Sequence, residues 1–288
     1  MLRSLARLSA SLVLLCHFAL AASLSRPRGL ESKTSLLRYV RDLNYGVTAT
    51  AADNQRIEEL VQSLIDSDAP RTTAPAEAFF RSSAGGRSIA EGNWTLLYTN
   101  GPDVTGIGKI PGVKLTYVGQ KVDTKARLIT NYVNASGVLA DTAQEVYVGI
   151  RQRNASAVDL DFESTKIKLL KLFGSPKFLG KNVEEWKPFE FKINQEEFKK
   201  SLERSKRSPP FFNVLYLDDT LRIQRTGEGY LFIIAKQAPP SGSTWSLGDN
   251  LGDGAKRILG ILGIVPYVIF AAVALKDFLN YDITVDVQ

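Results

Sequence analysis

The sequence has almost none of the side chains on which most enzymes and metal sites depend. Its 288 residues contain one cysteine, Cys16, and one histidine, His17. Both lie in a segment with the features of a removable leader, so the processed chain is expected to lack thiols and imidazoles. This excludes cysteine or serine–histidine catalysis, thiolate or imidazole zinc sites, and haem or iron–sulfur ligation by these residues. We therefore expect no catalytic residue, no metal site and no cofactor.

A strong charge of one sign is also missing. Lysine and arginine number 36 against 30 acidic residues, which gives a formal net charge of +6. This excess is too small to predict a nucleic-acid partner. The 44% hydrophobic and 23% charged content is typical of a chain that folds around a core.

The N-terminus has the order of a targeting leader. Arg3 and Arg7 precede an apolar run from Leu8 to Leu20, which predicts a signal peptide over residues 1–21. Residues 22–32 are rich in serine and arginine, a composition typical of a transit peptide. Such a two-part leader resembles those of proteins sent to a plastid enclosed by extra membranes. A buried N-terminal helix is the alternative.

A second apolar stretch lies near the C-terminus. Ile258 to Leu275 is eighteen residues without a charge, the lower limit for spanning a hydrocarbon core of about 30 Å. It predicts a hydrophobic membrane-anchor helix over residues 258–279, preceded by a Gly-, Ser- and Asp-rich linker over 238–257. An in-plane membrane helix and a buried helix of the fold remain alternatives.

The region between these ends changes its hydrophobic period. Apolar residues at helical spacing, such as Ile57, Leu60 and Leu64, predict two amphipathic helices within residues 33–68. Residues 90–237 then alternate apolar and polar side chains with turn signals between the runs. This predicts a mainly β fold, an antiparallel sheet that curls into a barrel of about eight strands.

Two segments interrupt this strand pattern. Residues 164–210 are rich in lysine and contain prolines, so we expect an insertion with a short helix near residues 195–204. Gly101 and Gly106 have the spacing of a phosphate-binding loop but lack the lysine that should follow. They therefore predict a turn-rich loop.

The charged residues of the strands favour structural roles. Asp159, Asp161 and Glu163 alternate with apolar residues and are expected on a solvated outer face rather than in a catalytic pair. Arg222 and Arg225 require partners if they are buried, and Asp218 or Asp219 is the nearest counterion in sequence.

One set of motifs resembles a known family. Gly92-Asn93-Trp94 opens a strand after two helices, and a long motif runs from Tyr216 through Asp218, Asp219 and Arg222 to Arg225 before the run Tyr230 to Ile233. The sequence in this respect resembles the plastid lipid-associated proteins, or fibrillins, from about Leu36 to Lys236. The resemblance implies a lipocalin-like barrel at thylakoids or plastoglobules that carries no agreed catalytic residues. The hydrophobic C-terminal segment departs from the usual peripherally bound member.

The resemblance and the residues together predict a non-enzymatic binder of an apolar lipid, carotenoid, quinone or galactolipid, held at a membrane. The candidates for ligand contact are aromatic residues: Trp94, Tyr98, Tyr132, Tyr147, Phe162 and Phe232. The family-motif residues Gly92, Trp94, Tyr216, Asp218, Asp219, Arg222 and Arg225 are expected to be structural. The alternatives are a structural subunit with a filled barrel packed on a photosynthetic membrane complex, and an enzyme that uses Asp, Lys or Tyr.

Overall fold

The computed structural model describes residues 28–67, 75–82, 86–205 and 208–236. The expected signal peptide, linker and anchor helix, and the first part of the transit-like segment, lie outside these residues. Within the described ranges, no helix combines the length and the apolar content needed to cross a membrane. The described chain forms two compact units, one built from α2 and α3 and the other from the remaining elements.

The first unit is a pair of antiparallel helices. Helix α2 (Arg28–Val40) and helix α3 (Ala51–Ser67) are joined by hydrogen bonds near both ends, between the hydroxyls of Ser32 and Ser63 and from Tyr39 Oη to Asp53 Oδ1. The apolar positions at helical spacing are buried, as the sequence predicts: Leu36, Val40, Ile57, Leu60, Val61 and Leu64.

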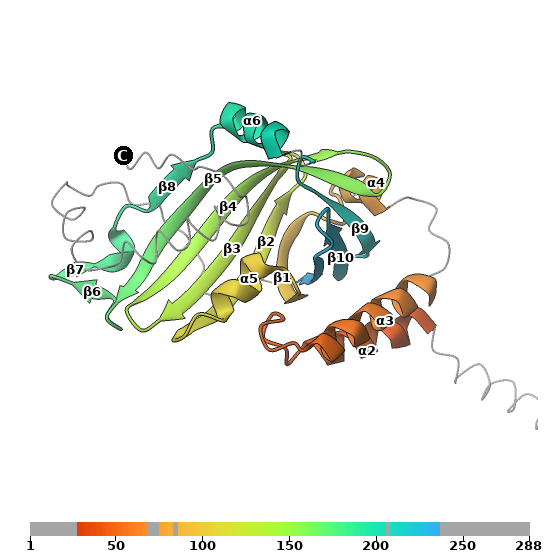
Figure 1. Ribbon diagram of the computed structural model, residues 1–288, viewed down its shortest axis with the longest axis horizontal. Helices are drawn as coiled ribbons and strands as arrows, with labels where there is room; N and C mark the ends of the chain where they lie inside the picture. The colour runs from red at the N-terminus through yellow and green to blue at the C-terminus, as the bar shows by residue number, and fades with distance from the viewer. Residues whose placement is uncertain (1–27, 68–74, 83–85, 206–207, 237–288) are drawn as a thin grey trace, which may run out of the picture. The chain divides into compact units, whose positions relative to one another are not determined.

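The second unit is a large antiparallel sheet whose strand ladder closes on itself (Figure 1). Its strands are β1 (Gly92–Thr99), β2 (Val113–Asp123), β3 (Leu128–Gly137), β4 (Ala140–Gln152), β5 (Ala157–Leu172), β8 (Phe189–Lys192), β9 (Phe211–Leu217), β10 (Leu221–Thr226) and β11 (Leu231–Lys236). The order is β4-β3-β2-β1-β11-β10-β9-β5-β8, and β4 also pairs with β5. Strands β1 to β5 and β9 to β11 therefore form a ring, and β8 lies beside β5. The mainly β, antiparallel expectation is confirmed.

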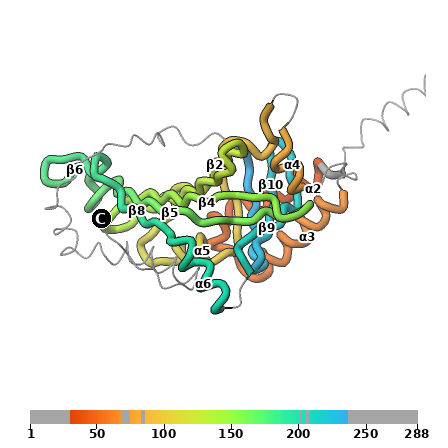
Figure 2. Tube along the Cα trace, turned by 90° about the horizontal axis from the view of Figure 1, so that it is seen from above, coloured from red at the N-terminus to blue at the C-terminus, as the bar shows by residue number. Residues whose placement is uncertain are grey.

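The ring has long and short walls. β4 and β5 contain 13 and 16 residues, whereas β10 and β11 contain 6 each. The seam between β5 and β9 consists of three residue pairs, from Ala157↔Asn213 to Asp159↔Phe211. Beyond this seam β5 pairs with β8 instead. The long strands consequently extend well past the closed part of the ring (Figure 2).

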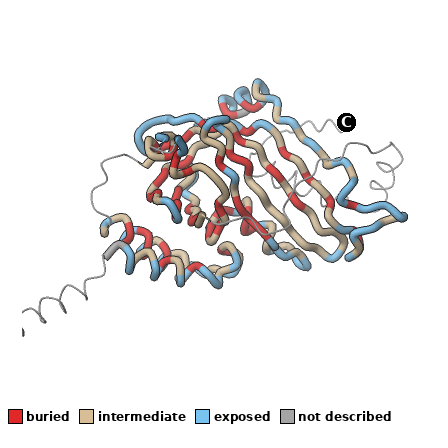
Figure 3. Tube along the Cα trace, turned by 180° about the vertical axis from the view of Figure 1, so that it is seen from behind, coloured by how far each residue is buried: buried red, intermediate tan, exposed pale blue. Residues whose placement is uncertain are grey.

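Helix α4 (Pro75–Phe80) closes one end of the ring. Its Ala76 N–H donates to Ala155 O in the β4–β5 turn at 3.1 Å, and its Phe79 ring lies 5.9 Å from the Phe212 ring. Phe79 packs in the main core of the second unit beside Trp94 and other buried strand residues. Buried and partly exposed residues alternate along the strands around this core (Figure 3).

Helix α5 (Pro102–Gly108) corrects the prediction of a turn-rich loop at Gly101 and Gly106. Pro102 fits the first turn of a helix because that turn does not use its backbone N–H. The Thr105 N–H and hydroxyl both bond to Gly101 O, at 3.1 and 2.9 Å, and this contact outweighs the helix-breaking effect of the glycines.

The lysine-rich segment is only partly an insertion. Strand β5 continues through its first residues to Leu172, so the expected start at residue 164 is wrong. The reason is that Thr165, Ile167 and Leu169 keep the alternation of a strand and are buried. A small hairpin follows, β6 (Lys177–Phe178) and β7 (Lys181–Asn182), then the short helix η1 (Val183–Glu185) and β8. Helix α6 (Gln195–Ser205) covers the position at which the sequence predicts a helix.

Candidate functional site

The interior of the ring contains a cavity of about 170 Å³. Every strand of the ring contributes to its wall, together with helix α5. Most of the lining side chains are apolar: Leu96, Val104, Ile107, Val118, Val133, Val146, Leu160, Phe162, Phe212, Phe232 and Ile234. The cavity therefore suits a hydrophobic molecule or part of one.

A chain of polar side chains crosses the ring beside this cavity. Arg222 on β10 donates through Nη2 to Gln120 Oε1 on β2, and Gln120 donates through Nε2 to Asn131 Oδ1 on β3 at 2.6 Å. Gln120 and Asn131 line the cavity. Because these amides bond to each other and to the guanidinium, their polarity is already partly satisfied within the protein.

The Arg222 guanidinium is fully buried between aromatic rings. Its Cζ lies 5.0 Å from the centre of the Trp94 ring and 5.4 Å from that of Phe79. Burial lowers the pKa of Arg222 to about 9, which leaves it charged at neutral pH. Attraction between the cation and the ring faces compensates part of the lost hydration. Trp94 Nε1 donates to Ala90 O at 2.8 Å, so the indole is also held.

The expected pairing of Arg222 with Asp218 or Asp219 is wrong. Among the described residues, Arg222 contacts no carboxylate, and its Nε and Nη1 have no hydrogen-bond partner. Its neighbour Gln224 lines the cavity on the same face of β10, so Arg222 points into the ring while the β9–β10 turn lies at the end of the strand. Sequence proximity therefore gave the wrong counterion.

Asp218 instead holds the β9–β10 turn. Its Oδ1 accepts hydrogen bonds from the Thr220 N–H at 2.8 Å and the Leu221 N–H at 2.7 Å, and its Oδ2 accepts from Tyr216 Oη at 2.7 Å. Asp219 is exposed. At the other end of β10, Arg225 Nη1 donates to Gly229 O at 3.1 Å across the β10–β11 turn. The polar part of this motif is thus built from turn contacts.

Two polar atoms in the cavity wall have no hydrogen-bond partner within the part of the chain that the structure describes. Asp103 Oδ1 on α5 and Gln224 Oε1 on β10 are buried without a hydrogen bond. Both atoms lie near Phe232. Gln224 pairs with Phe232 across the two strands. A Cβ added to Gly101 would lie 2.5 Å from Asp103 Oδ1 and 3.4 Å from Phe232 Cζ, which places these two atoms on the same side of Gly101. Burial raises the pKa of Asp103 to about 6, with a smaller contribution from Glu228.

Two of the six predicted ligand-contact aromatics line the cavity with their rings: Phe162 and Phe232. Tyr132 also borders the cavity, but it lies between the inward Asn131 and Val133 and pairs with Glu145, so its side chain points to the outer face. Phe162 also packs against Phe198 of α6, with ring centres 6.4 Å apart, so α6 lies against the cavity-side face of β4 and β5. Trp94 belongs to the closed end of the ring and does not line the cavity. Gly92 begins β1 with a φ of 111°, a conformation that suits glycine.

Tyr98 and Tyr147 do not reach the cavity, contrary to expectation. In β1 a bulge lies between Leu96, which lines the cavity opposite Ile234, and Tyr98, which pairs with Ile233. The extra residue moves Tyr98 to the other face of the sheet. Tyr147 follows the cavity-lining Val146 directly and so points outward, where its hydroxyl donates to Glu145.

The polar residues of the site were not predicted from the sequence. Gln120, Asn131, Gln144 and Gln224 all line the cavity from strands, and Asp103 does so from α5. When the sequence of one strand is considered alone, an inward-facing glutamine or asparagine cannot be distinguished from a solvent-exposed one. The signal that was present is their spacing by two from apolar lining residues, as Gln120 from Val118 and Asn131 from Val133.

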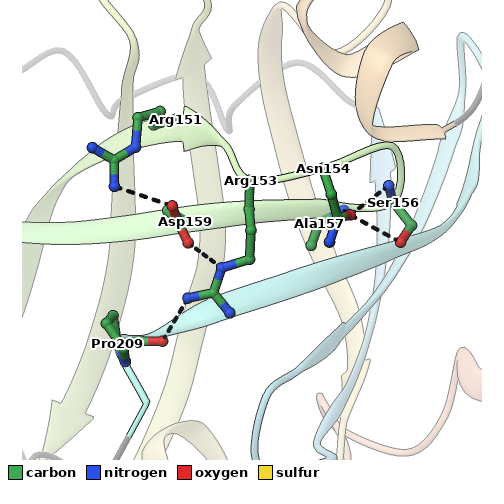
Figure 4. A network of polar contacts seen from close by, with 7 residues as sticks. All are labelled: Arg151, Arg153, Asn154, Ser156, Ala157, Asp159 and Pro209. Atoms are coloured by element: carbon green, nitrogen blue, oxygen red, sulfur yellow. Dashed lines mark hydrogen bonds and ion pairs between the residues drawn. The ribbon is translucent and has the colours of Figure 1, made fainter.

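The acidic residues of β5 lie outside the cavity, as predicted. Asp159 bonds to Arg151 Nη2 at 3.1 Å and to Arg153 Nε at 2.5 Å (Figure 4). Arg153 also lies over the Phe211 ring at 4.1 Å, and its Nη2 donates to Pro209 O at 3.3 Å. This network joins β4, β5 and the start of β9 across the narrow seam of the ring. Among the described residues, no group of three or more metal-ligating side chains was found.

The chain matches a known family over most of its length. The PAP_fibrillin family model matches residues 30–235. The chain is 26% identical over 220 residues to a light-induced chloroplastic protein of Solanum tuberosum, an alignment that covers 68% of this chain and 64% of that protein. It is 25% identical over 228 residues to plastoglobulin-1, chloroplastic, of Pisum sativum, with 71% and 60% covered.

A third relative has a chromoplast name. The chain is 24% identical over 237 residues to chromoplast-specific carotenoid-associated protein C1 of an Oncidium hybrid cultivar, covering 73% of this chain and 70% of that protein. The chain thus spans less than two thirds of the potato and pea relatives. No solved structure gives a significant match. The resemblance seen in the motif residues is confirmed, and the chain belongs to the PAP/fibrillin family of plastid lipid-associated proteins.

Proposed function

We propose that this chain is a non-enzymatic plastid protein that binds part of a lipid or isoprenoid molecule inside a lipocalin-like barrel. The observation that carries the proposal is the cavity enclosed by all the strands of the ring, with its mostly apolar wall. The names of its relatives, which include a plastoglobulin and a carotenoid-associated protein, support the same class of ligand and a plastid location.

The volume of the cavity limits what it encloses. At about 170 Å³ it is smaller than the 300–1,000 Å³ typical of sites that bury a whole drug-sized ligand. A carotenoid, a long-chain quinone or a galactolipid is therefore expected to place one end inside and to leave the rest outside. The uneven ring allows this, because its long strands continue past the closed part.

The polar wall favours an end that carries a hydroxyl group. The unpartnered Asp103 Oδ1 accepts hydrogen bonds, and the Gln224 amide both accepts and donates them. A hydroxyl can donate its proton to one of these oxygens, whereas a pure hydrocarbon leaves both buried and unpaired, which is unfavourable. Among plastid lipids this favours hydroxylated carotenoids, quinols and glycerolipids over hydrocarbon carotenes.

The thylakoid or the plastoglobule is the proposed site of action, where such lipids are concentrated. The expected two-part leader and C-terminal anchor would bring the chain there and keep the barrel close to its ligands. The competing proposal is a structural subunit on a photosynthetic membrane complex. The filled end of the ring, with Trp94, Arg222 and Phe79 packed together, is the observation that favours it.

Photolabelling of the full-length chain in detergent separates the two. A diazirine derivative of farnesol is expected to label peptides that contain Phe162 and Phe232, and an excess of plastoquinol, carotenoid or galactolipid should displace it. Val146→Phe, which fills the cavity, should reduce the labelling, whereas Val113→Phe, outside the cavity wall, should not. Labelling of these peptides that no lipid displaces and that Val146→Phe leaves unchanged would favour the structural subunit.

A further inference from the structure

Three large apolar side chains are exposed at one end of the second unit. Val138 in the β3–β4 turn is 73% exposed, Phe173 after β5 is 52% exposed, and Leu179 in the β6–β7 turn is 76% exposed. Within the described part of the second unit, no other large apolar side chain is exposed. We call Val138, Phe173 and Leu179 the apolar tips.

The apolar tips belong to one end of the long strands. The Phe173 N–H donates to Leu139 O at 2.7 Å, which joins the end of β5 to the β3–β4 turn. The Phe173 ring lies 6.2 Å from that of Phe178, the residue before Leu179. Figures 1 and 2 both place β6 at the end of the strands away from α4, so the tips lie far from the plugged end of the ring.

The backbone at two of the tips is unusual for large apolar residues. Phe173 and Leu179 both have a φ of 50°, and the glycine after each is also left-handed, with φ values of 74° at Gly174 and 79° at Gly180. Each pair fills the two central positions of a tight turn, because Leu172 bonds to Ser175 and Phe178 pairs with Lys181. Asparagine and glycine are the preferred residues of such turns, and a bulky residue there is strained.

Packing of the tips does not explain this strain. Both side chains are more than half exposed, and a Cβ built on either following glycine would meet nothing within 4 Å. Backbone strain at Phe173 and Leu179 that no packing contact explains suggests that these side chains have a function. The turns that carry the tips are anchored by a small hydrophobic core, in which Leu172 and Val183 are buried and pack with Trp186 and Phe178.

Basic residues surround the tips. Lys177 and Lys181 flank the Leu179 turn on both sides and are exposed. The segment from residue 166 to 187 contains lysines at 166, 168, 171, 177, 181 and 187 and glutamates at 184 and 185. Of these lysines, Lys166 and Lys171 pair with Glu190 and Asp141. With Glu190 and Asp141 counted, six lysines stand against four acidic residues, so this part of the chain keeps a small positive excess. Lys177 and Lys181 are its exposed members at the Leu179 turn.

We propose that the apolar tips insert into the interface of a lipid leaflet that contains anionic head groups, while Lys177 and Lys181 contact those head groups. Apolar side chains beside lysines are the combination that binds at such an interface. The inference rests on the proposed lipid function for the nature of its partner, but it concerns a surface separate from the cavity. In this orientation, the projecting ends of the long strands β4 and β5 face the lipid, and the end of the ring closed by α4 faces away from it.

A local probe tests the insertion in the full-length chain, whatever its terminal segments contribute to membrane attachment. In a Cys16→Ser background, Leu179→Cys carries an NBD fluorophore, and Lys125→Cys in the β2–β3 turn carries it as the control. With phosphatidylcholine vesicles containing phosphatidylglycerol, NBD at position 179 should shift to the blue and brighten several-fold, and NBD at position 125 should not. High salt or pure phosphatidylcholine should weaken the response, by about five-fold in binding constant for each lysine involved.

Substitution of the tips separates docking from folding. Phe173→Asn and Leu179→Asn create the Asn-Gly pairs that these turns prefer, so the unfolding midpoint should stay the same or rise. Phe173→Asn should at the same time raise the lipid concentration needed for the NBD response at position 179 by about ten-fold, because the variant lacks an aromatic side chain that inserts into the lipid. A purely structural role for these residues predicts the opposite, a lower unfolding midpoint.

Two results would overturn the proposal. The first is an NBD signal at position 179 that ignores vesicles while farnesol still labels the cavity, which leaves the ligand-binding function standing. The second is an NBD signal that rises with protein concentration in the absence of lipid, since this assigns the tips to contact with a second copy of the chain. Loss of cavity labelling with intact vesicle insertion would instead overturn the proposed function alone.

Discussion

The guanidinium of Arg222 lies 5.0 Å from the centre of the Trp94 indole ring, inside the closed end of the ring. The two residues come from β10 and β1, and β11 separates these strands. Neither side chain is exposed. Their contact therefore ties the first strand of the sheet to its last hairpin through the interior, in addition to the hydrogen bonds of the ladder.

This contact should be measurable as a coupling energy. Trp94→Leu and Arg222→Met each keep an apolar side chain in place but remove the ring or the charge. We expect a double-mutant cycle on the free energy of unfolding to give a coupling of about 1–2 kcal/mol, the range of a buried cation–ring contact. Denaturant unfolding measures it. Additive effects of the two substitutions would mean that the residues only fill space.

Asp103 should make stability depend on pH. Burial raises its pKa to about 6, above the ordinary value of 3.8. The folded state then holds the proton more tightly than the unfolded state, so this residue lowers the free energy of unfolding as the pH rises from about 4 to 6. Asp103→Asn should abolish this decrease in the free energy of unfolding, because asparagine does not ionise.

Chemical unfolding of the Asp103→Asn variant at two pH values checks this expectation. We expect a gain of about 1–3 kcal/mol at pH 7.5 and little change near pH 4, where the aspartate is neutral. Asp123→Asn provides the control, because Asp123 lies outside the cavity wall, at the end of β2, where its Oδ1 accepts backbone N–H bonds from Lys125 and Ala126. An equal gain at both pH values would show that the buried charge is not the cause.

The family motif should depend on Asp218 far more than on Asp219. Asp218 accepts hydrogen bonds from two backbone N–H groups of the β9–β10 turn and from the Tyr216 hydroxyl, whereas Asp219 is exposed. Asp218→Ala should therefore lower the free energy of unfolding by about 1–3 kcal/mol, the cost of unpaired turn groups. Asp219→Ala should change it by less than about 0.5 kcal/mol. Thermal unfolding of the two variants is the comparison.

Gln224 should set the preference between alcohols and hydrocarbons. Its Oε1 is unpartnered in the cavity wall, so Gln224→Leu keeps the side-chain volume and removes the polar group. We expect the variant to lose the preference for farnesol over farnesene, which for one hydrogen bond is about five- to ten-fold. Competition in the photolabelling assay measures it, and Gln152→Leu, at an exposed position of β4, is the matched control. A preference that survives Gln224→Leu would assign the selection to Asp103.

The parts of the fold that repeat a simple period could be predicted from the sequence. The helical spacing of apolar residues from Leu36 to Leu64 predicts the two helices, and the alternation of apolar and polar residues from Trp94 onward predicts the antiparallel strands. Features that depend on single irregular residues could not. The bulge that turns Tyr98 away from the cavity is one extra residue in β1, and the plug formed by Phe79 sits on a helix of six residues.

The site was harder to predict because its polar residues act across the ring. Arg222 donates a hydrogen bond to Gln120, which is 102 residues away in the sequence, and does not contact Asp218 or Asp219. Strand periodicity shows which face a residue is on, but it does not show which strands lie opposite. The pairing of β1 with both β2 and β11, which closes this side of the ring, is information that only the three-dimensional structure contains.

The short β5–β9 contact has a consequence for loading. Three residue pairs, two flanking backbone hydrogen bonds (Leu160 N–H to Pro210 O and Val214 N–H to Ser156 O) and the Asp159 network join the two edges there. Because so few bonds join the ring along this side, we expect local opening to cost less free energy there than elsewhere in the wall. For the lipid ligand proposed above, we therefore expect entry from the side, between β5 and β9, in addition to entry end-first through the rim.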